Sequence, residues 1–397
     1  TVSGGWINYA NGYASTVSGG WDNNGADTVT LSSGGRYNNV YNDWSSIHGG
    51  EYNNAYGYWG VIGGGSYNVL AYYYTTISGG HNSYTYGYTG TISGGMYNSV
   101  YYVKWSTVSG GYSNMVYGAY NTIGGGKDNY ATGYASTVGG GSYNYLYSSY
   151  NTIGGGAYNR AYSYAATISG GYYNTVYGSW GTVSGGKYNV AYSYCSHIAG
   201  GNNHSVYGYT ASVGGGDYNR AYGYCSCVSG GEDNGVFDSW TSVTGGHGNI
   251  VYDGWSNIAG GKDNIVYASW SGIAAGANNK VYSTYSGING GISNTVYGYS
   301  SSIIGGSAVK LYGGYATVLN GYSKSMYGQY VTSQVRPHTA VAMLLNPASC
   351  SYVARRSACC ILSLTGLQPL RLFVLWHGDR RPQQHCDLEL CCIIWRH

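Results

Sequence analysis

Charged residues, proline and phenylalanine are scarce in this chain. Of its 397 residues only 8% are charged, and it contains 4 Pro and 2 Phe. An ordinary soluble domain has about 25% charged residues, so the usual surface of Lys and Glu is missing. The formal net charge is +3, and its carriers are scattered. Because no basic stripe is present, we expect no nucleic-acid partner.

Glycine and tyrosine are abundant instead, with 70 Gly and 52 Tyr. Collagen is excluded, because it needs Gly at every third position. Disorder is excluded as well, because β-branched and aromatic residues recur in a fixed register. A short tandem repeat therefore accounts for the composition.

The repeat is about fifteen residues long and extends over residues 1–331. If position one is the residue after each Gly pair, successive units are 172–186, 187–201 and 202–216. Asn stands at position three, Val or Ala at five, Tyr at six, Val or Ile at twelve, and Gly at fourteen and fifteen. One extra residue enters near Val103 and Lys104, and the unit with Asp27–Ser33 is irregular. This period is too short for the helical-repeat families.

Each unit contains two short segments with alternating character. Positions three, five and seven should point inward in the first, and positions ten, twelve and fourteen in the second, while Tyr at six points outward. The Gly pair makes a turn. We therefore predict an all-β fold, a parallel β-solenoid (β-roll) with two short strands per fifteen-residue coil and about 22 coils. Strands stacked about 4.8 Å apart would make a rod of roughly 100 Å.

The predicted core is thin, so stability must come from stacking many coils. The Asn column should form an internal ladder in which each amide bonds the next, as Asn ladders do in stacked sheets. Its central members are Asn144, Asn159, Asn174 and Asn189.

The Tyr residues at position six should form an outward ladder. Joined by turn aromatics such as Trp180, Trp240, Trp255 and Trp270, they would make a continuous amphipathic stripe. Exposed aromatic patches of this extent usually mark an interface, which predicts lateral self-association. Alternatively the Tyr rows only stabilise the sheet through cross-strand pairing, and both interpretations can hold together. The ladder comprises Tyr147, Tyr162, Tyr177, Tyr192, Tyr207, Tyr222, Tyr252, Tyr267, Tyr282 and Tyr297.

A second outward column carries Thr at position eleven. A flat Thr array could order water, which makes ice binding a minor alternative, but Thr also suits any exposed strand position. The column decays to His197, Cys227, Asn257 and Gly272, whereas an ice-binding face should stay regular. Ser and Thr rows could instead carry O-linked glycans. The tripeptide Asn203-His204-Ser205 has the pattern of an N-glycosylation sequon, and the alternative is that this pattern occurs by chance. The Thr column is Thr76, Thr91, Thr107, Thr122, Thr137, Thr152, Thr167 and Thr182.

Catalytic motifs are not found in the sequence. The Gly-Gly-Gly runs are turns, because none lies between a strand and a helical pattern. His residues occupy different repeat positions, and acidic residues lie mostly after the Gly pair, as Glu51, Asp217 and Glu232 do. We therefore expect no enzyme, no metal site and no cofactor. Cys195 and Cys225 lie two coils apart, about 9.6 Å, which is beyond disulfide reach.

The composition changes in residues 332–397. All four Pro and six of the nine Cys lie here: Pro337, Pro347, Pro369, Pro382, Cys350, Cys359, Cys360, Cys386, Cys391 and Cys392. The segment could be a disulfide-stapled cap over the last coil, or the product of a shifted reading frame. The apolar stretch 360–376 contains Gln368, Pro369 and Arg371, so we expect no membrane span.

Segments 137–144 and 166–178, which contain Thr-Val-Gly-Gly-Gly-Ser-Tyr-Asn and Ala-Thr-Ile-Ser-Gly-Gly-Tyr-Tyr-Asn, resemble the head repeats of YadA-like trimeric autotransporter adhesins. The resemblance implies a parallel β-roll at a cell surface. The period here is fifteen rather than fourteen, and no coiled-coil stalk or membrane-anchor strands are seen. We expect an extracellular structural protein, a self-assembling fibre or filament subunit whose main partner is itself. The alternative is an adhesin head that binds an external ligand such as a glycan.

Overall fold

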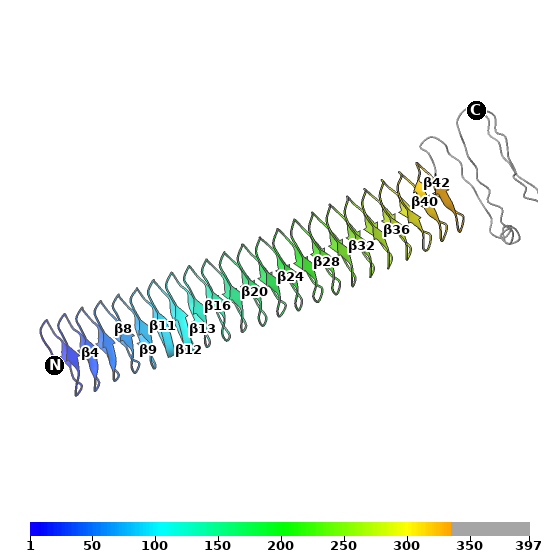
Figure 1. The fold of residues 1–397 in the computed structure, drawn as a ribbon. Coiled ribbons are helices and arrows are strands. Elements are labelled where there is room, and N and C mark those ends of the chain that lie inside the picture. Colours follow the sequence, from blue (N-terminus) through cyan, green and yellow to red (C-terminus); the bar gives the residue numbers. More distant parts are fainter. Residues whose placement is uncertain (335–397) are drawn as a thin grey trace, which may run out of the picture. The chain divides into compact units, whose positions relative to one another are not determined.

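The computed structural model describes residues 1–334, which form 42 short strands and contain no helix. The strands stack as a parallel β-solenoid of about 22 turns, so the predicted fold class is confirmed. Figure 1 shows these coils following one another along a single axis. Of the tail that we predicted for residues 332–397, the structure describes only Thr332–Gln334, which form a strand that pairs with the coil before it. Residues 335–397 lie outside the described part of the chain.

Two rows of strands run along the solenoid. The first row covers positions four and five and contains β1 (Tyr9–Ala10), β3 (Asn24–Gly25), β5 (Asn39–Val40), β7 (Asn54–Ala55), β9 (Val69–Ala71), β13 (Met115–Tyr117), β15 (Tyr130–Ala131), β17 (Tyr145–Leu146), β19 (Arg160–Ala161), β21 (Thr175–Val176), β23 (Val190–Ala191), β25 (Ser205–Val206), β27 (Arg220–Ala221), β29 (Gly235–Val236), β31 (Ile250–Val251), β33 (Ile265–Val266), β35 (Lys280–Val281), β37 (Thr295–Val296), β39 (Lys310–Leu311) and β41 (Ser325–Met326).

The second row covers positions eleven and twelve. It contains β2 (Thr16–Val17), β4 (Thr30–Ser32), β6 (Ser45–Ile47), β8 (Val61–Ile62), β10 (Thr76–Ile77), β14 (Thr122–Ile123), β16 (Thr137–Val138), β18 (Thr152–Ile153), β20 (Thr167–Ile168), β22 (Thr182–Val183), β24 (His197–Ile198), β26 (Ser212–Val213), β28 (Cys227–Val228), β30 (Ser242–Val243), β32 (Asn257–Ile258), β34 (Gly272–Ile273), β36 (Gly287–Ile288), β38 (Ser302–Ile303), β40 (Thr317–Asn320) and β42 (Thr332–Gln334). Only β11 (Tyr84–Ile92) and β12 (Ser99–Val108) extend through both rows.

Every pairing is parallel, and equivalent residues of neighbouring coils lie side by side, as Thr152 and Thr167 do. The register shifts near the end of the described chain, between β40 and β42, where Asn320 pairs with Gln334. It also shifts between β11 and β12, where Tyr86 pairs with Tyr101 but Tyr88 pairs with Lys104. This shift accommodates the extra residue seen in the sequence as a bulge, and the regular phase resumes at once.

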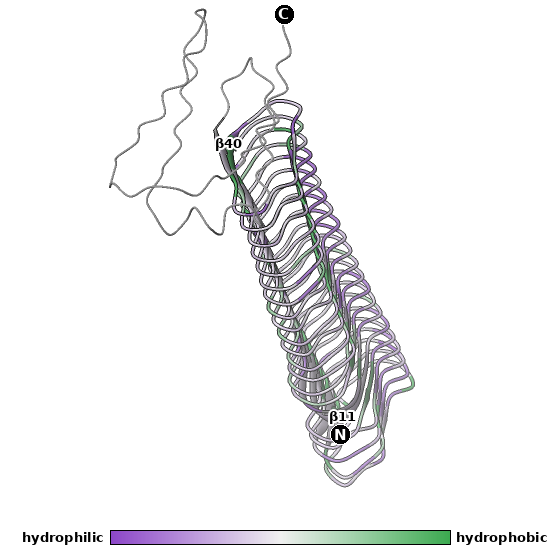
Figure 2. Ribbon diagram, turned by 90° about the vertical axis from the view of Figure 1, so that its right-hand side faces the viewer, coloured by the Kyte–Doolittle hydropathy of each residue, from purple (hydrophilic) through white to green (hydrophobic). Residues whose placement is uncertain are grey.

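The core is one residue thick from each row. Val176 from the first row and Val183 from the second are fully buried, and so are most of their equivalents, except at the two ends, where Val2 is exposed and Met326 is only partly buried. In Figure 2 the hydrophobic residues accordingly form rows along the coils rather than one compact cluster. The irregular coil keeps its register but places Ser32 in the core, where its hydroxyl has no hydrogen-bond partner.

Two corners of most coils use left-handed residues other than glycine. In one coil these are Tyr173 (φ 54°) and Trp180 (φ 58°), at positions two and nine. Most amides donate to the next coil, but the amide of Tyr173 donates to the Ala157 carbonyl of the preceding coil at 3.0 Å, and Trp180 does the same to Tyr164. These reversed bonds hold a conformation that would otherwise cost roughly 1–2 kcal/mol per residue.

The Gly pair has two different roles, which corrects one prediction. A Cβ on Gly186 (φ +84°) would lie 2.1 Å from the carbonyl oxygen of Gly201, so position fifteen needs Gly for close approach. A Cβ on Gly185 would meet nothing within 4 Å. The expectation that position fourteen points inward was therefore wrong, because the chain has already turned out of the core there.

Candidate functional site

The outward Tyr at position six form one uninterrupted stack of thirteen rings, here called the Tyr ladder. It extends from Tyr147 to Tyr327, with Phe237 in place of one Tyr. Neighbouring ring centroids are 4.2–5.3 Å apart, and the planes differ by 1–19°. The backbone sets this spacing, because each ring follows a strand whose neighbour is one coil away, as the bond from the Tyr147 amide to the Ala161 carbonyl illustrates.

Stacking decides which part of each ring is available. The faces of the rings are covered by the neighbouring rings, so the edges and hydroxyl groups form the outer surface. Residues from Tyr177 to Tyr312 keep 37–44% of their surface exposed. The ladder thus presents a band of aromatic edges rather than flat faces, and it cannot hold a sugar or a base against an open ring face along its length.

Partial burial also changes the acidity of the phenols. Burial raises the pKa of Tyr147, Tyr162 and Tyr267, because the charged phenolate would lose hydration. Burial, together with a hydrogen bond involving Tyr207, raises the pKa of Tyr192 to about 12. These phenols stay protonated at neutral pH and can donate hydrogen bonds from the exposed band.

Four cations share the face of the Tyr ladder. Arg160, Arg220, Lys280 and Lys310 stand at position four of their coils, on strands β19, β27, β35 and β39. Arg160 lies over the ring of Tyr145 at 6.0 Å from its centroid.

The corner aromatics make a separate row. Trp240, Trp255 and Trp270 stack with centroids 5.3 and 4.9 Å apart, and Trp180 meets the ring of Tyr164 edge-on. Among ring pairs in contact within the described chain, none joins this row to the Tyr ladder. The predicted continuous stripe is therefore two parallel rows.

The predicted Asn residues lie buried in one internal column. Asn174 shows the pattern: its side-chain amide donates to the carbonyls of Gly170 (3.0 Å) and Gly186 (2.9 Å), and its Oδ1 accepts the backbone N–H of Asn189 (3.1 Å). Asn144, Asn159 and Asn189 repeat the same bonds to glycine carbonyls. Each amide mainly bonds the backbone, and a direct amide-to-amide bond joins only some pairs, such as Asn159 to Asn144 at 3.2 Å.

A second internal ladder was not predicted. At position ten, the hydroxyl of Ser271 accepts the backbone N–H of Ser286 at 3.2 Å and donates to the Ser283 carbonyl at 2.9 Å. Asn121 occupies the same position and accepts the amide of Ser136 at 2.8 Å. The sequence contained a signal for this second ladder. Positions three and ten each lie two residues before a core residue, and both carry small polar side chains.

One histidine replaces Asn in the internal column. His204 is fully buried, its Nδ1 accepts the amide of Asn219 at 3.1 Å, and its Nε2 has no hydrogen-bond partner. Burial lowers the pKa of His204, because the cost of desolvating the imidazolium outweighs the opposing effects of the Gly216 backbone and the Asp217 carboxylate. The sequon at Asn203 therefore has its middle residue inside the coil.

The Thr column lies in register on the second row, from Thr76 on β10 to Thr182 on β22. Beyond it His197 follows on β24, as the sequence indicated.

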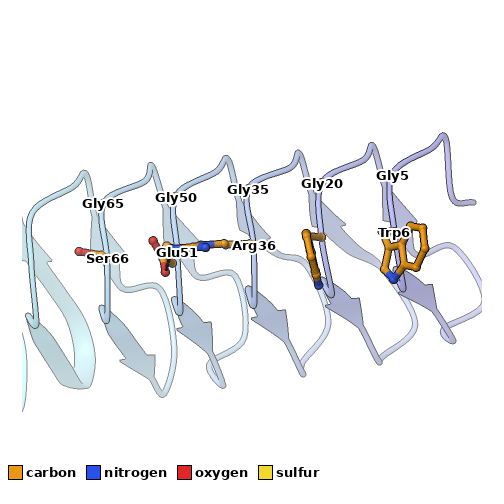
Figure 3. Close-up of a pocket in the computed structure, with 10 residues that line it drawn as sticks. Gly5, Trp6, Gly20, Gly35, Arg36, Gly50, Glu51, Gly65 and Ser66 are labelled. Atoms are coloured by element: carbon orange, nitrogen blue, oxygen red, sulfur yellow. Dashed lines mark ion pairs between the residues drawn. The ribbon is translucent and has the colours of Figure 1, made fainter.

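A groove of about 920 Å³ runs beside the glycine turns of the first coils (Figure 3). Its floor is made by Gly5, Gly20, Gly35, Gly50 and Gly65, and its sides by position-one residues such as Trp6. Arg36 and Glu51 form an ion pair at 2.5 Å, and the hydrogen bond to Glu51 raises the pKa of Arg36. The groove lining contains no His or Cys.

Within residues 1–334, no three His, Cys, Asp or Glu side chains lie close enough to share a metal ion. Cys195, Cys225 and Cys227 are free thiols. No helix of this part is long and apolar enough to span a bilayer. Neither a protein-family model nor a curated protein matches the chain.

Proposed function

We propose that this protein is an extracellular structural protein whose rods associate side by side with copies of themselves through the Tyr ladder. The observation that carries the proposal is the uninterrupted stack of thirteen partly exposed rings from Tyr147 to Tyr327. We propose an extracellular location because the repeats resemble those of cell-surface proteins.

The exposed area is large enough for a stable contact. Each aromatic side chain has on the order of 200 Å² of surface, and about 40% of it is exposed in the ladder. Thirteen rings thus offer about 1,000 Å² per rod, whereas a stable interface needs roughly 800 Å² per partner. Only a surface with the same coil spacing matches the band along its whole length, and a second copy of the chain has that spacing.

The charges on this face influence how two rods meet. Arg160, Arg220 and Lys280 are four coils apart, so cations would repel when equivalent coils face each other. A stagger of two coils still brings Lys280 opposite Lys310, so part of the repulsion remains, and salt screens it over about 10 Å at 0.1 M. We therefore expect association to strengthen as salt increases, unlike a contact held by ion pairs.

End-to-end continuation of the internal ladder is less well supported. The Asn column ends within the solenoid, because Val309 and Lys324 stand where Asn is expected. Val309 has no acceptor to offer a following coil, and the ammonium of Lys324 is buried without a hydrogen-bond partner among the described residues. Burial lowers the pKa of Lys324. These two coils cannot extend the Asn ladder into another molecule.

Electron microscopy and sedimentation of the full chain at increasing concentration and salt test the proposal. We expect laterally bundled rods with an axial layer spacing of about 4.8 Å. Replacing three ladder residues by Thr, which Thr132 shows to be tolerated at position six, should disperse the bundles without unfolding the coils. The variant is Tyr192→Thr, Tyr207→Thr and Tyr222→Thr.

The matched control changes three Tyr at position two to Asn, the residue that Asn203 places in the same left-handed conformation. It consists of Tyr158→Asn, Tyr173→Asn and Tyr188→Asn, and it should bundle like the original chain. Discrete rods that never bundle would contradict the proposal and favour the adhesin-head alternative.

A further inference from the structure

We propose that the Tyr ladder is a site of oxidative modification, at which tyrosines of neighbouring rods become joined as o,o′-dityrosine. The inference rests on the proposed side-by-side association. The reactive positions of an oxidised tyrosine are the phenol oxygen and the two ring carbons ortho to the carbon that bears this oxygen. In this ladder the neighbouring rings cover the ring faces and leave the ring edges half-exposed.

The chemistry needs a one-electron oxidant, for which we name hydrogen peroxide used by a haem peroxidase. One peroxide takes a hydrogen atom, as one electron and one proton, from each of two phenols, and it leaves as two waters. The two phenoxyl radicals then form a carbon–carbon bond between their ortho carbons. Each of these carbons loses its hydrogen to a phenol oxygen, which restores both aromatic rings.

Ring geometry favours coupling between chains over coupling within one ladder. The new bond lies in the planes of both rings, so those planes must intersect along it. Tyr207 and Tyr222 have planes only 1° apart with centroids 4.6 Å apart, and Tyr192 and Tyr207 differ by 7°. Such stacked rings cannot share an in-plane bond unless they leave the stack. Edges that meet across two rods have no such restriction.

One natural substitution shows that the phenol is dispensable for the stack. Phe237 lies between Tyr222 and Tyr252 with centroids 4.9 and 5.1 Å away and nearly parallel planes. A Tyr→Phe change therefore removes the oxidisable group and keeps the ring stack within the chain.

The experiment mixes full-length chains labelled with ¹⁴N and ¹⁵N, lets them assemble, and records bundling by light scattering before any oxidant is added. Horseradish peroxidase and hydrogen peroxide then follow, and mass spectrometry identifies the cross-linked peptides. We expect cross-links of mixed isotope that map to position six. Two variants are compared, the ladder variant Tyr177→Phe, Tyr192→Phe, Tyr207→Phe and Tyr222→Phe, and the corner control Tyr143→Phe, Tyr158→Phe, Tyr173→Phe and Tyr188→Phe.

The cross-link yield of each variant is divided by the bundling recorded before oxidation. Per bundled chain, the ladder variant should lose all cross-links at its four positions, while the corner control keeps the original yield. Bundles that form without mixed-isotope cross-links, or cross-links that fall equally in both variants, overturn this inference and leave the association standing. Chains that do not bundle before oxidation overturn both.

Discussion

Replacing one Asn of the internal column by Ala should expose the backbone N–H of the next Asn in the column, and not the backbone N–H of the replaced residue itself. In Asn174→Ala the N–H of Asn189 loses its acceptor, and the carbonyls of Gly170 and Gly186 each lose a donor. Gly186 keeps the amide of Tyr172 as a partner. An orphaned buried N–H costs about 1–3 kcal/mol, and each lost bond about 0.5–1.5 kcal/mol. The sum is about 2–6 kcal/mol.

Amide hydrogen exchange is the appropriate assay, because a long solenoid opens locally rather than in one step. The lower bound of about 2 kcal/mol corresponds to a roughly 30-fold faster exchange of the Asn189 amide. The amide of residue 174 should stay protected, since its acceptor is Oδ1 of Asn159. The control is Thr175→Ala, on the outward side of the same strand. Equal loss at residues 174 and 189, or no loss at 189, would refute the reasoning.

Three further outcomes are expected. Gly186→Ala should destabilise its coil by about 2–5 kcal/mol, because residue 186 is left-handed and its new Cβ would meet a backbone carbonyl. The control Gly185→Ala should change stability by less than about 0.5 kcal/mol. Thermal unfolding followed by circular dichroism compares the two variants. Local stability around His204 should be full above the unfolded pKa of about 6.5 and fall below it, because burial lowers the folded pKa; hydrogen exchange at several pH values should show this dependence and lose it in His204→Asn. Because the folded pKa of Tyr192 is raised to about 12, the free energy of unfolding should decrease as pH rises from about 10 towards 12. A phenolate absorbance titration with its midpoint near 10 and no loss of structure would contradict this prediction.

The sequence alone predicted much of the candidate site as well as the fold. A period of fifteen with apolar residues at five and twelve allows only a short two-stranded coil, and the core rows at Val176 and Val183 follow directly. The Asn column and the outward Tyr could be assigned because strand side chains alternate. The direction in which the side chain at position fourteen points could not be assigned from the sequence, since the alternation ceases where the strand ends and the chain turns.

What the sequence determined is therefore the set of residues that lie in one column, because the repeat fixes which residues come side by side when coils stack. Tertiary structure decided what each column does. Ring planes of Tyr207 and Tyr222 become parallel only when a coil fifteen residues away supplies the neighbouring face. The Asn174 amide selects glycine carbonyls over the next amide because those carbonyls converge on it from two coils. The backbone conformation of Tyr173 and Trp180 is likewise held by bonds to the coil before. All of these depend on contacts between coils, which no single repeat contains.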